Sequence, residues 1–225
     1  HHHPGMNILF VHNGNDLYGA GRSLLRLTSR LCSDGHAVTV VMPSAGPLVE
    51  ALVASGASVR PLQDLAIIDR QAFRSVGSLL GLGSSIPRST NELMRIMQEV
   101  KPDVVHTNVS VIFTASRAAQ RLGIPHVWHI REIYAEFPLF WPVYRRVMSR
   151  GANRIVAISD AVAVGVRTAA LHDVEDTVAI AIQVEVVRRA VAIGVVVARI
   201  AVTVEILVQI RNAVVVVIQI RGVDE

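Results

Sequence analysis

The first 160 residues alternate between short apolar runs and longer segments whose apolar positions recur at helical spacing. A short continuous apolar run is typical of a strand buried on both faces, whereas apolar residues three and four apart predict an amphipathic helix. These patterns predict strands at 7–13, 36–42, 58–62, 103–107, 125–130 and 154–159. They predict helices at 23–31, 48–54, 91–100, 111–122 and 141–151, and they leave the glycine- and serine-rich segment 69–88 unassigned.

Strands that alternate with helices in this way predict an α/β protein built on a parallel sheet. Connections between parallel strands are right-handed, so helices cover both faces and the sheet becomes doubly wound and Rossmann-like. Ligands of such sheets bind beyond the carboxyl ends of the strands. The residues that follow each predicted strand are therefore the first candidates for a functional site.

Polar side chains follow several of the predicted strands. The set of histidines, asparagines, arginines and glycines at these positions suits a phosphorylated or sugar-like ligand. The candidates for lining such a cleft are Asn13, His106, Asn108, Arg131, Glu132 and Ser159.

A glycine-containing loop connects the first predicted strand to the first helix. It includes Gly19, Ala20, Gly21 and Arg22. Glycine lets the backbone approach a ligand closely, and a helix N-terminus attracts anions. The loop matches neither the Walker sequence nor the dinucleotide-binding glycine pattern, and a tight strand-to-helix turn explains it equally well.

His129 ends an apolar strand and stands two residues before Arg131. Near neutral pH, an imidazole can donate a hydrogen bond to a sugar hydroxyl or stabilise developing charge. A hydrogen-bonded structural histidine is the alternative, and both interpretations apply to His106 as well.

The remaining histidines carry weaker signals. We treat His12 and His36 as incidental, and we interpret His126, which lies within a strand, as structural. No histidine pair shows metal-ligand spacing with a carboxylate partner, so we expect no metal site.

The composition changes after Asp160. In segment 161–225, 39 of 65 residues are Val, Ala or Ile, and the segment has no Lys, Ser, Pro, Met, Cys or aromatic residue other than histidine. Its two-residue alternation around 178–186 indicates strands. We therefore divide the chain into a Rossmann-like domain at 6–160 and a tail at 161–225, for which partial or non-native sequence, as from a shifted reading frame, is one explanation.

The chain is basic, with a formal charge of +4 and a pI of about 10. Arginine bias from GC-rich coding is one explanation, and a surface that meets phosphates or anionic lipid is another. Arg145, Arg146 and Arg150 follow Trp141 and could lie on an anionic membrane, although a solvated helix face fits them too. Nucleic acid is not expected, because no stripe of bases interleaved with aromatics is present.

Cys32 is the only cysteine, which excludes an intrachain disulfide and a cysteine-based zinc site. Residues 1–5 are interpreted as the remainder of an affinity tag. From Met6 onward no secretory signal is visible and no apolar run reaches the length of a membrane span, so we expect a cytoplasmic protein.

Several of these segments together resemble the family 4 glycosyltransferases with the GT-B fold. The segments that carry the resemblance are 7–12, 18–25, 101–108, 123–132 and 154–159. The most specific of them is the run from Gly123 to Glu132, which contains His129. The resemblance covers about Met6 to His172 and corresponds to the N-terminal, acceptor-side domain of that fold.

The resemblance implies an enzyme that transfers a sugar from a UDP- or GDP-linked donor to a lipid-linked or saccharide acceptor, with retention of configuration and without a metal or other cofactor. It implies roles in cell-envelope or exopolysaccharide synthesis, at times on a membrane surface. Residues Gly19–Gly21, with Arg22, would face the donor diphosphate, and His129 would lie near the transferring sugar as the catalytic residue.

Two departures from the family pattern keep alternatives open. Arg22 stands where the family often has an acid, and no two glutamates lie eight residues apart as in the donor-binding half. We therefore expect this chain alone to be inactive. The alternatives are a non-catalytic Rossmann-like ligand-binding domain and another GT-B enzyme, such as a sugar-nucleotide epimerase.

Overall fold

The computed structural model describes residues 5–68, 76–131, 147–148, 150–157 and 178–180. These residues contribute seven strands to one sheet, in the order β3-β2-β1-β4-β5-β6-β7, with every neighbouring pair parallel. The strands are β1 Asn7–Val11, β2 Ala37–Met42, β3 Ser58–Pro61, β4 Val104–Thr107, β5 His126–Ile130, β6 Arg154–Ala157 and β7 Val178–Ile180. This order, which reverses between β1 and β4, confirms the predicted doubly wound sheet.

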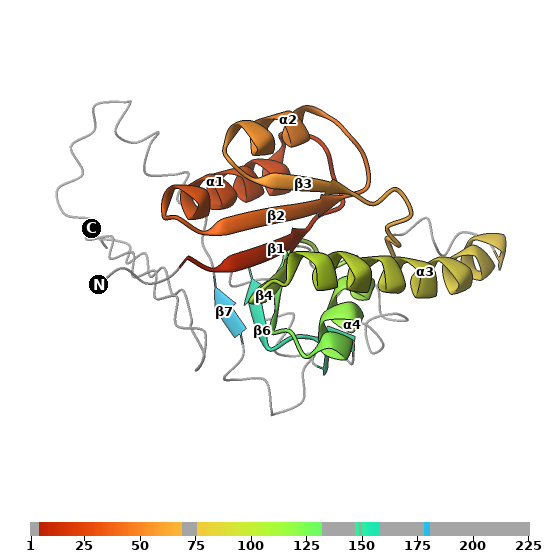
Figure 1. Cartoon of the computed structure of the whole chain (residues 1–225). Coiled ribbons are helices and arrows are strands. Elements are labelled where there is room, and N and C mark those ends of the chain that lie inside the picture. Colours follow the sequence, from red (N-terminus) through yellow and green to blue (C-terminus); the bar gives the residue numbers. More distant parts are fainter. Residues whose placement is uncertain (1–4, 69–75, 132–146, 149, 158–177, 181–225) are drawn as a thin grey trace, which may run out of the picture.

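Helices cover both faces of the sheet (Figure 1). Their bounds are α1 Gly19–Ser33, α2 Pro47–Ala54, α3 Val76–Val100 and α4 Phe113–Leu122. Helices α1 and α2 pack on one face beside β1, β2 and β3, whereas α3 and α4 pack on the other.

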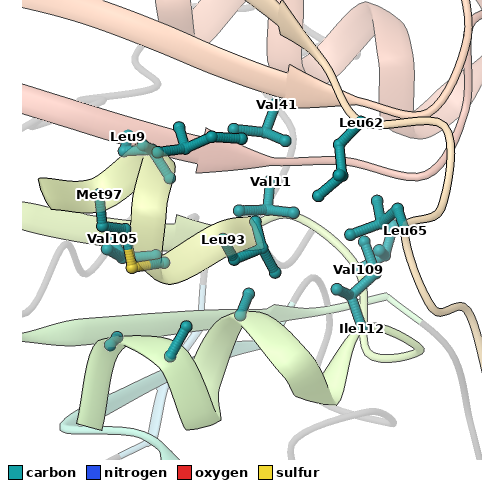
Figure 2. Close-up of a cluster of buried hydrophobic side chains, with 14 residues drawn as sticks. Leu9, Val11, Val41, Leu62, Leu65, Leu93, Met97, Val105, Val109 and Ile112 are labelled. Atoms are coloured by element: carbon teal, nitrogen blue, oxygen red, sulfur yellow. The ribbon is translucent and has the colours of Figure 1, made fainter. Parts of the chain in front are cut away.

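Alternate residues of the central strands belong to two separate cores. Leu9, Val11 and Val105 face α3 and α4, in the cluster shown in Figure 2. Ile8 and Phe10 belong to the core under α1 and α2. Burial on both faces is the physical reason for the unbroken apolar runs in the sequence.

Helix α3 is longer than the sequence pattern predicts. It begins at Val76, within the segment left unassigned, and it contains Pro87. Among the positions of α3 whose exposure is described, Gly81, Gly83 and Ser84 are exposed and Ser89 is buried. The glycines and Pro87 of the first turns lower helix propensity, which is why the sequence pattern leaves this segment unassigned.

The expected strand character of the tail is found in β7, whose three residues pair with β6. The rest of segment 161–225 lies outside the described residues. Residues 132–146 and 149 lie outside them too, and they include about half of the predicted helix at 141–151. The proposed domain boundaries therefore stay predictions.

Helix α1 begins four residues earlier than expected, so the predicted glycine loop at 19–22 is its first turn. Gly21 is buried, and a Cβ there would overlap the backbone oxygen of Asp16 and lie 3.1 Å from Leu48 Cδ2. Gly19 has no atom within 4 Å of such a Cβ. The close packing of α1 against the turn that contains Asp16 therefore requires glycine at position 21 but not at position 19.

Gly21→Ala should therefore destabilise the protein by about 1–3 kcal/mol, the usual cost of overpacking. Gly19→Ala is the matched control, and it should be neutral or stabilise by about 0.5–1 kcal/mol, because alanine is the better helix former. Urea unfolding of both variants measures the difference. Equal stability of the two variants would contradict the described packing.

Candidate functional site

The carboxyl ends of β1, β4 and β5 lie side by side and present polar residues on the α1 face of the sheet. His12 follows β1, Asn108 follows β4 and Arg131 follows β5. The Asn108 N–H donates to Val11 O at 3.0 Å, and its Nδ2 donates to Ala20 O at 3.3 Å. Asn108 therefore joins two strand ends to the first turn of α1.

Arg131 adds a second set of connections at the same place. Its Nη2 donates to Asn108 Oδ1 at 3.2 Å and to Ser23 Oγ at 2.9 Å, and its Nε donates to Asn108 O at 3.3 Å. The guanidinium is thus held between the end of β4 and helix α1, where it places a permanent positive charge at the edge to which ligands of such sheets bind.

His106 on β4 and His129 on the neighbouring strand β5 lie on the same face of the sheet. Their rings make an edge-to-face contact with centroids 5.6 Å apart, and the His106 ring also lies 4.8 Å from Phe10. Among the described residues, neither ring nitrogen of His129 has a hydrogen-bond partner, although the residue is only 7% exposed. Unpartnered buried nitrogens are costly, so His129 differs from an ordinary structural histidine.

Burial and the nearby guanidinium keep these imidazoles uncharged. Burial, followed by Arg131, lowers the pKa of His12 to about 4, and the carboxylate of Asp16 opposes that shift. Burial, then His126 and Arg131, lower the pKa of His106 to about 3. Burial, then Arg131 and His106, hold the pKa of His129 well below its ordinary value. At neutral pH these rings can form hydrogen bonds but supply no positive charge.

His126 has both ring nitrogens engaged on the opposite face of the sheet. Its Nδ1 lies 2.8 Å from Gly151 O and must donate to it, so Nε2 accepts from Thr107 Oγ1 at 2.8 Å. Ser116 Oγ donates to the same carbonyl at 2.6 Å. Burial lowers the pKa of His126 to about 4 despite the Gly151 bond, which acts in the other direction. This geometry fits its interpretation as a structural histidine.

His12, which we treat as incidental from the sequence, lies among the strand-end residues in the structure. The residue is 2% exposed, and its Nδ1 lies 3.3 Å from Asn108 Nδ2. The sequence prediction extended the first strand to residue 13, whereas β1 ends at Val11. Because β1 ends at Val11, His12 is the first residue after the strand and belongs to the strand-end positions.

The other predicted site residues are distributed as follows. Asn13 is half-buried in the turn after β1, Arg22 is exposed on the first turn of α1, and Arg150 is exposed. Glu132, Ser159, Arg145 and Arg146 lie outside the described residues.

Within the part of the chain that the structure describes, no three His, Cys, Asp or Glu side chains are grouped to hold a metal ion. Nor does any described helix combine the length and hydrophobicity needed to cross a bilayer.

Comparison with protein families matches residues 18–173 to the model of Glycosyltransferase Family 4. Comparison with curated proteins gives no match.

Several solved structures share the fold. The chain is similar to HepE of Anabaena in complex with UDP and glucose, with 14% identity, a TM-score of 0.58, and coverage of 84% of this chain and 50% of HepE. It is similar to a glycosyltransferase from Rickettsia africae, with 17% identity, a TM-score of 0.52, and coverage of 79% and 43%. It is also similar to a putative UDP-N-acetylglucosamine 2-epimerase from Listeria monocytogenes, with 10% identity, a TM-score of 0.51, and coverage of 78% and 44%. The chain thus spans about half the length of these proteins, as one half of a GT-B fold does.

The neutral histidines predict a loss of stability in acid. Because their pKa values in the folded protein lie below the ordinary 6.5, the unfolded chain binds more protons as the pH falls below that value. Between pH 7 and pH 5, His12, His106 and His126 should each lower the free energy of unfolding by about 2 kcal/mol. His106→Leu removes one of these histidines. Urea unfolding at both pH values should therefore show a decrease in the free energy of unfolding that is about 2 kcal/mol smaller than in the unmodified chain. An identical loss in the variant would contradict a neutral, buried His106.

Proposed function

Since the chain belongs to Glycosyltransferase Family 4, we propose that it is the acceptor-side half of a retaining enzyme that transfers a sugar from a nucleotide sugar to a lipid-linked or saccharide acceptor. The proposed donor is UDP- or GDP-linked, and the proposed reaction uses no metal or other cofactor. The presence of UDP in the HepE structure supports the donor class.

The observation that carries this proposal is the neutral imidazole of His129, which has no hydrogen-bond partner among the described residues and lies near the permanent charge of Arg131. Glycosyl transfer passes through an oxocarbenium-like transition state, which a positively charged histidine would oppose. A neutral imidazole can instead donate a hydrogen bond to a hydroxyl of the transferring sugar.

The departing diphosphate needs the opposite kind of environment. It gathers negative charge in the transition state, and preorganised positive groups stabilise such charge. Arg131 and the N-terminus of α1 provide two such groups at the same sheet edge, because Arg131 donates to Ser23 in the second turn of that helix. The site therefore separates a neutral group for the sugar from positive groups for the leaving group.

The similarity to the Listeria epimerase supports a second candidate, because the same half-fold could serve a sugar-nucleotide epimerase. A non-catalytic binding domain is the third. The partner half of the fold distinguishes them, since two glutamates eight residues apart would favour the transferase.

The proposal also includes a cytoplasmic location and a role in polysaccharide synthesis. It further includes attachment to an anionic membrane through Arg145, Arg146 and the exposed Arg150.

The chain alone should bind nucleotide sugars weakly or not at all, because it spans about half of the proteins that it resembles. Calorimetry with UDP-glucose and a GDP-linked sugar should therefore show no tight binding. Sub-micromolar affinity would mean that the tail builds a complete donor site, which would contradict the assignment to one half of the fold.

In an enzyme that contains both halves, His129→Ala should lower turnover about 10²–10³-fold, the usual cost of losing one preorganised donor. Because the ring is buried, turnover is normalised to the folded fraction measured by circular dichroism. His36→Ala is the matched control, since His36 precedes β2 at the amino edge of the sheet and should leave turnover unchanged. Normal turnover per folded molecule of His129→Ala would remove this residue from the active site.

A further inference from the structure

The orientation of the Asn108 side chain is determined by its neighbour Arg131. A guanidinium can only donate hydrogen bonds, so the oxygen of the Asn108 amide must face Arg131, at 3.2 Å. The amide nitrogen must then face the other way, toward Ala20 O and His12 Nδ1, each at 3.3 Å. A flipped amide would place its nitrogen against the Arg131 guanidinium, donor against donor, and its oxygen against Ala20 O, acceptor against acceptor.

This orientation determines the tautomer of His12. The Asn108 Nδ2 can only donate, so His12 Nδ1 must accept and carries no proton. Burial lowers the pKa of His12 to about 4, and the ring is therefore neutral at pH 7 with a single proton. That proton must lie on Nε2.

The Nε2–H group faces the turn that precedes α1. A Cβ at Gly14 would lie 3.5 Å from His12 Nε2 and 3.8 Å from Asp16 Oδ2. Among the described residues, no hydrogen bond reaches Nε2, and the residue as a whole is 2% exposed. Because position 14 is glycine, no side chain from that position stands between Nε2 and the turn.

We propose that His12 is a ligand-binding residue that donates its Nε2–H to a phosphoryl oxygen of the substrate, with Asn108 and Arg131 as the positioning residues that hold its tautomer. This inference rests on the proposed function, which supplies a diphosphate at this edge of the sheet. The N-terminus of α1 and the Arg131 guanidinium favour an anionic acceptor over a neutral one. The nearby Asp16 carboxylate, which accepts from the Tyr18 N–H at 2.9 Å, is the competing acceptor within the chain.

Nitrogen-15 NMR of the histidine rings tests the tautomer in the unmodified chain at pH 7. The His12 signals should show a bare Nδ1 and a protonated Nε2. In Asn108→Asp the new carboxylate can only accept, so Nδ1 of His12 should become protonated. Asn153→Asp is the matched control, because Asn153 already accepts through Oδ1 from the His126 N–H and should leave His12 unchanged. A protonated Nδ1 in the unmodified chain, or no response to Asn108→Asp, would overturn the inference.

A titration with UDP, followed by NMR, tests the ligand contact. The amide of glutamine can replace an Nε2–H donor, whereas that of asparagine reaches only the Nδ1 position. His12→Gln should therefore weaken UDP binding by less than about threefold and His12→Asn by about tenfold, the loss of one hydrogen bond to a charged group. Uridine, which lacks phosphates, should leave the His12 signals unchanged.

The outcomes separate the two proposals. Equal UDP affinity of the unmodified chain and both variants, or equal loss in both variants, would overturn the role of His12 and leave the proposed function standing. A uridine response at His12 equal to that of UDP would overturn the phosphoryl contact. No UDP-dependent shift in the unmodified chain at millimolar concentrations would overturn the ligand contact and leave the proposed function standing, because that function expects weak or no binding by this half of the fold.

Discussion

The contact between Arg131 and Asn108 is the interaction on which the rest of the strand-end site depends. It joins the ends of β4 and β5, and through Ser23 it reaches α1. Because a guanidinium does not lose its proton in a protein, Arg131 supplies a permanent positive charge at this point. Among the described residues, this charge lies near imidazoles that stay neutral, and the same contact orients the Asn108 amide.

The parallel sheet makes this arrangement possible, because successive side chains of a strand point to opposite faces. His106 and Asn108 lie on the α1 face of β4, whereas Thr107 between them faces away and bonds to His126. The same strands therefore carry a polar face toward α1 and a closed structural face on the other side. The chemistry of each histidine follows from its face, since His126 has two partners and His129 has none among the described residues.

Much of the framework could be predicted from the sequence, because buried parallel strands produce continuous apolar runs. The positions of His106, Asn108, His129 and Arg131 at strand ends followed from the same pattern. The first turns of α3 could not be predicted, since their glycines, their serines and Pro87 lower helix propensity. The partners of Arg131 could not be predicted either, because its bond to Asn108 spans 23 residues and exists only in the register of β4 against β5.

We propose that the ligand binds at the carboxyl edge of the sheet, between the N-terminus of α1 and the ring of His129. A crystal of the chain soaked with UDP would locate the ligand. We expect electron density for the diphosphate within hydrogen-bonding distance of His12 or Arg131. Density confined to the amino edge, where Asn7 bonds to Asp103 and His36 precedes β2, would contradict it.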